Sequence, residues 1–411
     1  KGLFDISFDN TLKIIDYKIN ASGNIQKSDL KFKKRNEYFF IKNNIKSLGL
    51  EKTEFKVSFG KNVKKSIDLS GLYKINENSL QKFTFKNLYN SSSNLVSING
   101  DFNDEILIPL INFEIKNKIV NINTELEIKK DIINIKKFNL IENKNKIIVK
   151  NLSFKNDKLL KFDSISIKTF IGNKLNNEFK IQYGTKIKIE GSKYDASNLT
   201  KLLDQNNNSN FLRNISKDVL LNIKEISTSA TDVLYNFNLI GKIKKGKFDK
   251  IVSKGEFKDG KFLDISLRID KTTDKKILEI YSDLPKPLLA NYKFFDGLSG
   301  GKILIFSTYD SKMSNTNITI ENFKVKDAPG LVKLLSLADF GGMVDAMSGE
   351  GLSFEKLEMS LNRNDQVLNL KELYAIGPSI SILMEGYVES KTGLVSLRGT
   401  MVPAKTLNKF L

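Results

Sequence analysis

The sequence contains no cysteine, no histidine and no tryptophan among its 411 residues. Without cysteine it can form no disulfide and has no thiol nucleophile. Without histidine it also lacks the commonest general base, and together these absences remove the usual ligands of transition metals. Among the carboxylates, lysines, tyrosines and hydroxyls that remain, no nucleophile with a base and an orienting partner can be named. The sequence therefore predicts a protein that is not an enzyme, with no catalytic residue, no cofactor and no metal.

Long apolar runs and nucleotide-binding motifs are lacking as well. The longest apolar candidates, 106–111 and 331–337, are far shorter than the ~18 residues of a membrane-spanning helix. The glycines of Gly300-Gly301-Lys302 do not have the spacing of a phosphate-binding loop, so we interpret them as a turn or helix end. The sequence thus offers no nucleotide site that could supply energy.

Arginine is scarce, although the net charge is +19: only five of the 66 basic residues are arginine. Base readout and forked phosphate contacts depend on arginine, so nucleic acid is not a predicted partner. The lysines are spread along the predicted strands, and a solvated outer sheet face explains them more simply. Attraction to anionic lipid head groups stays open as an alternative.

Apolar and polar residues alternate along most of the chain, which is the period of antiparallel strands with one apolar and one wet face. Phe4, Ile6 and Phe8 are the first example. No helix of useful length is expected before residue 195, which argues against a parallel α/β fold. Turns are predicted at the glycine- and asparagine-rich points 22–24, 60–62 and 143–145.

Three short helices are predicted between groups of strands. The first spans 194–204, the second begins near Pro287, and the third is an apolar helical hairpin at 328–347, opened by Pro329. The hairpin either packs as a plug on the end of a sheet, which apolar helical stripes usually do, or gates a cavity or dips into a membrane. Its apolar residues are Leu331, Leu334, Leu335, Phe340, Met343, Val344 and Met347.

The apolar strand faces need a covering, and the predicted helices are too few to supply it. The sheet could close on itself as a sandwich or barrel with a dry core. It could instead curl into a trough whose apolar lining is met by lipid chains. Alternation alone cannot separate a protein core from a ligand groove, and from the residues alone the sandwich is the safer interpretation.

Several short motifs follow one another in the second half of the chain. They are Gly191 with Tyr194-Asp195-Ala196-Ser197, Ser282-Asp283 before Leu288-Leu289, Gly300-Gly301, Ala328-Pro329-Gly330-Leu331, Gly349-Glu350-Gly351, Gly377-Pro378-Ser379, Gly386, and Gly399-Thr400-Met401-Val402-Pro403-Ala404. From about Gly191 onward this series resembles the C-terminal region of the AsmA-like family, most closely its YhdP-type members in Gram-negative bacteria. Residues 1–190 share only the strand-rich character. The family's N-terminal anchor is missing and the chain stops just after Leu407-Asn408, so we expect it to be part of a longer protein.

The resemblance implies a mostly β fold: an elongated, curled antiparallel sheet forming a repeating β-groove with a few short helices. We expect the chain to divide into three parts: a strand-rich segment 1–190, a repeat 191–300 opened by a short helix, and a C-terminal signature region 301–411. The implied function is periplasmic transport of phospholipid between inner and outer membranes, supporting outer-membrane integrity, with an inner-membrane anchor outside this chain.

The mechanism implied by the resemblance is physical: acyl chains lie against an apolar groove while head groups stay in water. The expected lining residues are Ile165, Ile167, Phe179, Ile181, Ile187, Ile189, Tyr235, Phe237, Leu239, Ile265, Leu267, Ile269, Ile303, Ile305, Ile318 and Ile320. The alternative is a scaffold or chaperone that pairs its strands with outer-membrane proteins during assembly, without lipid transport. The expected partners are phospholipids, both membrane surfaces and, in the alternative, a periplasmic or outer-membrane protein.

Overall fold

The computed structural model is mostly β, as the alternation predicted: strands make up 73% of the chain and helices 3%. The strands form a large, mostly antiparallel sheet that is not closed. The structure describes residues 1–38, 41–199, 212–229, 231–290, 297–326, 351–364, 366–389 and 392–403, with the backbone alone at 33–38, 41–43 and 403.

The chain divides into two compact units. Unit 1 comprises Lys1–Tyr194 with Asn206–Ile215, and unit 2 comprises Asp195–Gln205 with Ser216–Leu411. The boundary expected between 190 and 191 falls inside the strand Ile187–Asp195, and the two units divide between the last two residues of that strand. The boundary expected between 300 and 301 falls inside the strand Leu298–Tyr309, which pairs on both sides within unit 2.

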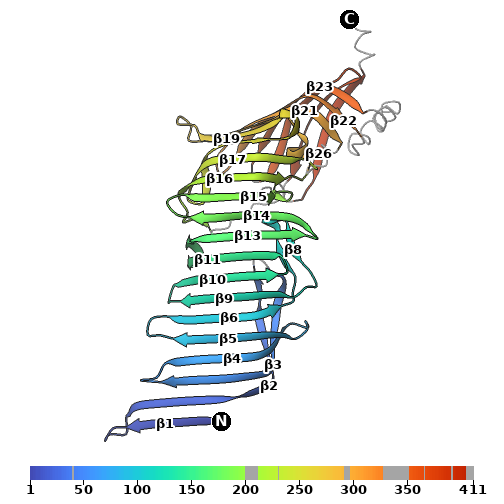
Figure 1. The fold of residues 1–411 in the computed structure, drawn as a ribbon. Helices are drawn as coiled ribbons and strands as arrows, with labels where there is room; N and C mark the ends of the chain where they lie inside the picture. The colour runs from blue at the N-terminus through green and yellow to red at the C-terminus, as the bar shows by residue number, and fades with distance from the viewer. Residues whose placement is uncertain are drawn as a thin grey trace. The chain divides into compact units, whose positions relative to one another are not determined.

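Unit 1 is a meander of antiparallel strands (Figure 1, blue to green). Its elements are β1 Gly2–Phe8, β2 Ile14–Tyr38, β3 Ile41–Gly60, β4 Lys65–Ile75, β5 Gln81–Tyr89, β6 Asn94–Phe102, β7 Ile106–Ile108, the 3-10 helix η1 Pro109–Ile111, β8 Phe113–Ile115, β9 Val120–Ile128, β10 Ile132–Glu142, β11 Asn145–Lys155, β12 Lys158–Lys161, β13 Ser164–Ile171, β14 Lys174–Tyr183 and β15 Ile187–Asp195. Most strands pair with the next one along the chain; β6 pairs with β9, so that β7, η1 and β8 form an insert, and β11 pairs with β13.

Unit 2 is also a meander of antiparallel strands, and its described residues contain no insert like β7 to β8. Its elements are β16 Lys217–Ser227, β17 Val233–Lys244, β18 Lys247–Glu256, η3 Lys258–Gly260, β19 Phe262–Ile269, β20 Lys276–Ser282, α2 Lys286–Leu289, β21 Leu298–Tyr309, β22 Ser314–Val325, β23 Leu352–Arg363, β24 Val367–Ile376, β25 Ile380–Glu389 and β26 Val395–Pro403. Each strand from β16 to β26 is antiparallel to the next. Of the predicted helices, α2 confirms the beginning of the one near Pro287. The helix predicted at 194–204 is wrong at its start, because Tyr194 and Asp195 end the strand β15, and its residues from 200 onward lie outside the described residues. The whole hairpin 328–347 also lies outside the described residues.

Asparagine, glycine and lysine close the tight turns. The β11–β12 loop has positive φ at both Asn156 and Asp157, and the β17–β18 loop has it at Lys245 and Gly246. Two-residue loops with two positive φ angles match the right-handed twist of the paired strands. The turns predicted at 60–62 and 143–145 are confirmed, since β3 ends at Gly60 and β10 and β11 are joined there.

The turn predicted at 22–24 is wrong. These residues lie inside the long strand β2, where Gly23 is paired with Phe55 of β3. A Cβ atom on Gly23 would lie 2.9 Å from the Phe55 ring, which is closer than van der Waals contact allows. Glycine at this position therefore makes room for an aromatic ring and does not reverse the chain.

The best-packed part of unit 2 is a row of residues across β21 to β25. Ile303, Ile320 and Leu357 are paired in register, and their exposed fractions are 1%, 0% and 5%. They belong to one buried cluster that also includes Leu289 of α2. Position-by-position pairing of apolar residues on one sheet face thus produces the core.

Candidate functional site

The predicted lining residues of unit 1 share one face of the sheet. Ile165, Ile181 and Ile189 are direct partners on β13, β14 and β15, and Ile167 is paired with Phe179. Residues directly opposite each other on paired strands have side chains on the same face. The structure therefore brings these predicted residues together, with Ile187 two positions before Ile189 on the same side.

The row to which Ile165 belongs is much longer than the sequence indicated. From β3 to β15 it crosses ten strands, and only one member is polar. This unit 1 row consists of Phe55, Leu69, Phe85, Ile98, Thr124, Phe138, Val149, Ile165, Ile181 and Ile189. All of its members except Thr124 and Val149 are half-buried, so apolar surface stays accessible along most of the row.

Unit 2 has a corresponding row across eleven strands, from β16 to β26. This unit 2 row consists of Leu221, Leu239, Ser253, Ile265, Ile280, Ile305, Ile318, Met359, Leu373, Met384 and Gly399. Leu239, Ile265 and Ile305 are half-buried, whereas the members on β22 to β25 are buried. Four predicted residues, Leu239, Ile265, Ile305 and Ile318, lie in this row. Its accessible part is therefore on β16 to β21.

The other predicted residues of unit 2 lie beside this row, with one exception. Leu267 and Ile303 occupy neighbouring positions on the same face, and Ile320 is fully buried in the core. Phe237 is 8% exposed and packs near Gly255, while Ile269, at the end of β19, is 36% exposed.

Tyr235 is the exception, because it lies on the opposite face from Phe237. It is paired with Glu256 of β18, on the exposed side of that strand, and the register of β17 shifts between Tyr235 and Asn238. Asn236, at the shift, has a φ of 51°. A bulge of this kind inserts one residue and reverses the alternation, which the sequence pattern of β17 does not reveal.

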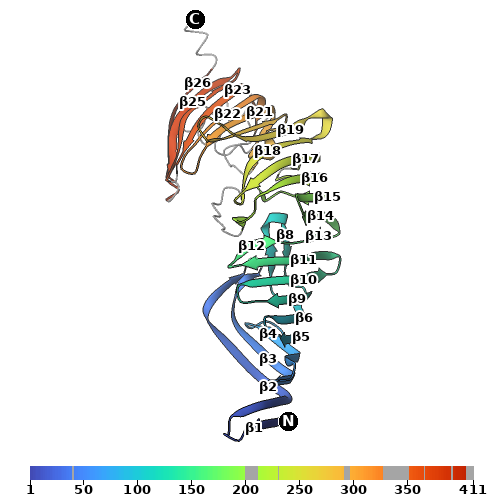
Figure 2. The same cartoon turned by 90° about the vertical axis from the view of Figure 1, so that its left-hand side faces the viewer.

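An insert that the sequence analysis did not predict covers part of the unit 1 face. It comprises β7, η1 and β8, residues 106–115, and Figure 2 shows β8 standing apart from β10 and β11. Its side chains Ile106 and Phe113 are 0% and 1% exposed. One backbone pairing, Ile41 with Ile106, joins it to β3. The insert is thus packed into the unit and not left in solvent.

Buried amides hold the insert over β14. The Asn177 side chain is fully buried on the same face as Phe179, and its Nδ2 donates hydrogen bonds to the carbonyl oxygen of Ile111 and to Thr169 Oγ1, both at 2.8 Å. The Tyr194 hydroxyl donates to the Leu110 carbonyl at 2.9 Å. The Tyr194 ring also meets Phe179 edge-on at 5.6 Å. The insert therefore covers the predicted lining near Phe179. In the sequence, the adjacent asparagines Asn176 and Asn177 were the hint that this part of the strand contacts another segment.

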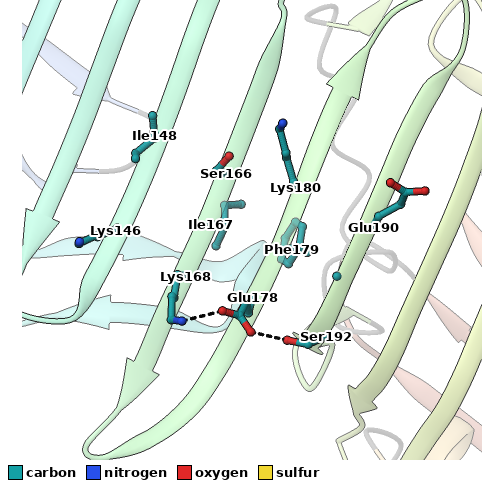
Figure 3. Close-up of a pocket in the computed structure, with 11 residues that line it drawn as sticks. Lys146, Ile148, Ser166, Ile167, Lys168, Glu178, Phe179, Lys180, Glu190 and Ser192 are labelled. Atoms are coloured by element: carbon teal, nitrogen blue, oxygen red, sulfur yellow. Dashed lines mark hydrogen bonds and ion pairs between the residues drawn. The ribbon is translucent and has the colours of Figure 1, made fainter.

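On the opposite, polar face of unit 1 the strands form a shallow hollow of about 400 Å³ (Figure 3). Lys146, Lys168 and Lys180 lie around it with Glu178 and Ser192. Glu178 accepts hydrogen bonds from Lys168 Nζ and from Ser192 Oγ, both at 2.6 Å. These two bonds, the lysine first, hold the pKa of Glu178 below its usual value.

Unit 2 has a hollow of about 540 Å³ on its own polar face. Ile240, Val252 and Leu304 line it and are 62%, 54% and 48% exposed. Tyr281 lies at its margin and donates a hydrogen bond to Asp283 Oδ1 at 2.6 Å. That bond, together with burial, raises the pKa of Tyr281 to about 12.

Within the described ranges, no helix is long and apolar enough to cross a membrane. No group of three acidic side chains in the same ranges is placed to hold a metal ion. The apolar hairpin residues from Leu331 to Met347 lie outside the described residues. The fold defines the chain as an open, mostly antiparallel β-sheet protein, and in unit 1 the apolar row and the lysine-lined hollow lie on opposite faces of the strands. Comparison with protein-family models, curated proteins and solved structures found no match.

Proposed function

We propose that this chain is a bridge-like carrier of phospholipids between the inner and outer membranes of a Gram-negative cell, as the resemblance to AsmA-like, YhdP-type proteins implies. The acyl chains lie along the apolar face, which curls into a groove, and the head groups stay in water. An inner-membrane anchor outside this chain holds it in the periplasm. The observation that carries the proposal is the unit 1 row, an apolar line across ten strands that stays half-buried.

The physical basis is the transfer of acyl chains from bilayer to protein. Each CH₂ group that is kept from water is worth about 0.8 kcal/mol, so an apolar row can offset extraction from the membrane. Neighbouring strands lie about 4.8 Å apart, and a row that offers apolar contact at each strand provides no single deep trap. A lipid can therefore move stepwise along the row. The direction of transport requires a gradient or an external energy source.

The test is native mass spectrometry with lipid extraction on protein purified from a Gram-negative host. Phe85 and Ile98 are direct partners in the unit 1 row, and Thr84 and Asn99 are direct partners on the other face of the same strands. We expect wild type and the Thr84→Asp/Asn99→Asp control to retain phospholipid. The Phe85→Asp/Ile98→Asp variant should lose it while its circular dichroism is unchanged. Lipid-free wild type, or equal loss in both variants, would contradict lipid carriage.

One observation favours the scaffold alternative. Every residue of β1 is exposed, including Phe4 at 70% and Leu3 at 63%, and its described pairing is with β2. An exposed apolar edge strand can pair with a strand of another protein. A photo-reactive residue placed at Phe85 or at Ser7 separates the two functions in cells. For lipid carriage we expect crosslinks from position 85 to phospholipid. Crosslinks from position 7 alone, and to protein alone, would support the scaffold.

A further inference from the structure

The positive charge of the chain is concentrated in one segment and is not spread evenly. Residues 129–193 contain sixteen lysines and six acidic residues, a net charge of +10 within a total of +19. The segment contains no arginine. It corresponds to β10 through β15 of unit 1 with their connecting turns. More than half of the net charge thus lies on about a sixth of the chain.

Strand register collects many of these lysines on the polar face. We call the side chains of Lys137, Lys146, Lys150, Lys168, Lys180 and Lys188 the basic face; they lie on β10, β11, β13, β14 and β15, and all are exposed. The apolar unit 1 row lies on the other side of the same strands, since Ile147 and Ile167 alternate with members of the basic face. This part of the sheet is therefore apolar on one side and cationic on the other.

Two pairs within the basic face oppose like charges. Lys137 is the direct partner of Lys150, and Lys146 is the direct partner of Lys168. Like charges directly opposite each other on paired strands are destabilising. Of the six lysines, Lys168 forms an ion pair, with Glu178 at 2.6 Å, and the other five have none among the described residues. The fold thus tolerates repulsion that a bound anionic surface would relieve.

We propose that the basic face docks onto the phosphate layer of an anionic lipid bilayer. The hollow of Figure 3 lies within this face. It is lined by Lys146, Lys168 and Lys180 together with Glu178 and Glu190, so its three ammonium groups outnumber its two carboxylates and give it a net attraction for a lipid phosphate. The proposal goes beyond lipid carriage, because it uses the opposite side of the sheet and does not require an acyl chain in the groove.

The residue type identifies the partner as a membrane and not a nucleic acid or a structured acidic protein. Lysine is a flexible point charge, suited to a fluid array of phosphates, whereas forked recognition of fixed groups uses arginine. Each lysine near an anionic surface strengthens binding by about fivefold, so six acting together give useful affinity without any specific pocket. High salt screens such contacts.

The test is flotation of the full chain with vesicles of phosphatidylcholine, with and without phosphatidylglycerol. The basic-face variant replaces Lys137, Lys146, Lys150, Lys180 and Lys188 by glutamine. A matched control removes the same charge elsewhere, by glutamine at the exposed lysines Lys56, Lys64, Lys82, Lys224 and Lys258. We expect wild type to bind only the anionic vesicles. The basic-face variant should bind at least about 100-fold more weakly and the control less than about tenfold.

A second variant separates docking from folding. Lys146→Glu/Lys150→Glu turns both like-charge pairs into opposite-charge pairs, so its melting temperature should rise by about 1–3 °C while vesicle binding falls. A merely structural role would not move stability and binding in opposite directions. The proposal is overturned if wild type does not bind anionic vesicles, if it binds neutral ones equally, or if the matched control loses as much binding as the basic-face variant.

Discussion

At the scale of single residues, Asn177 is a fully buried amide on an apolar sheet face, and its two hydrogen bonds tie η1 to β13 and β14. Asn177→Ala removes this donor from the Thr169 hydroxyl and leaves the Ile111 carbonyl with the longer hydrogen bond from Asn176 Nδ2, at 3.3 Å. A lost buried hydrogen bond of this kind costs about 1–3 kcal/mol. We expect that loss in the free energy of unfolding, measured by urea denaturation.

The control for Asn177 is Asn222→Ala. Asn222 lies exposed on β16, opposite Asn238, so its replacement should change stability by less than about 0.5 kcal/mol. Equal effects of the two substitutions would mean that the amide does not hold the insert.

Glu178 gives a pH-dependent prediction. Its pKa is lowered by the hydrogen bonds from Lys168 and then Ser192, so the ionised form stabilises the fold. This contribution is complete above the ordinary value of 4.5 and is lost as pH falls through the lowered pKa. Because the pair is exposed, Glu178→Gln should cost only about 0.5–1 kcal/mol at neutral pH, and less in strong acid. Denaturation curves at both pH values check this; a cost that grows on acidification would contradict it.

Two predictions for single residues, at Tyr235 and Gly23, differ from the structure. Tyr235 looked like a groove residue because it alternates with Phe237, but the bulge at Asn236 turns it to the other face. Gly23 looked like a turn, yet it lies in a strand against Phe55. Both outcomes depend on the residues of the neighbouring strand with which Tyr235 and Gly23 are paired. A single-strand pattern cannot contain that information.

At the scale of elements, the packed part of β21 to β25 separates core from surface. Ile320 of β22 is 0% exposed within the unit 2 cluster, whereas Leu304 of β21 is 48% exposed on the other face. We expect Ile320→Ala to reduce the free energy of unfolding by about 2–4 kcal/mol and Leu304→Ala by less than about 1. Chemical denaturation measures both; similar losses would mean that β22 is not packed as described.

Sequence alternation predicted the strands well and the insert not at all. The strands at Phe4, Ile265 and Ile318 were identified because their period of two is local to each element. The unit 1 row was predicted only in its last three members, from Ile165 to Ile189, because the register that joins them to Phe55 is non-local. The insert was missed for the same reason, since the side chains that hold it in place include Asn177 and Tyr194, which lie far along the chain.

At the scale of the whole molecule, the net charge of +19 opposes folding through self-repulsion. Sodium chloride screens this repulsion, so we expect the melting temperature to rise by about 2–5 °C between low and moderate salt. Chloride is preferable to sulfate, which also stabilises proteins by exclusion from their surface. A melting temperature that stays constant or falls with added chloride would contradict the prediction.

The two five-lysine variants locate the source of this repulsion. Both remove five charges, but only the basic-face variant removes them from a segment with a net charge of +10 and from two opposed lysine pairs. Coulomb repulsion between close charges exceeds that between distant ones, and at low salt it reaches over a Debye length of about 30 Å, which shortens to about 10 Å at 0.1 M. The basic-face variant should therefore melt higher than wild type at low salt and gain little from added chloride, while the matched control keeps most of the wild-type increase. If both variants respond to salt alike, repulsion follows total charge and the lysine-rich face carries no special share of it.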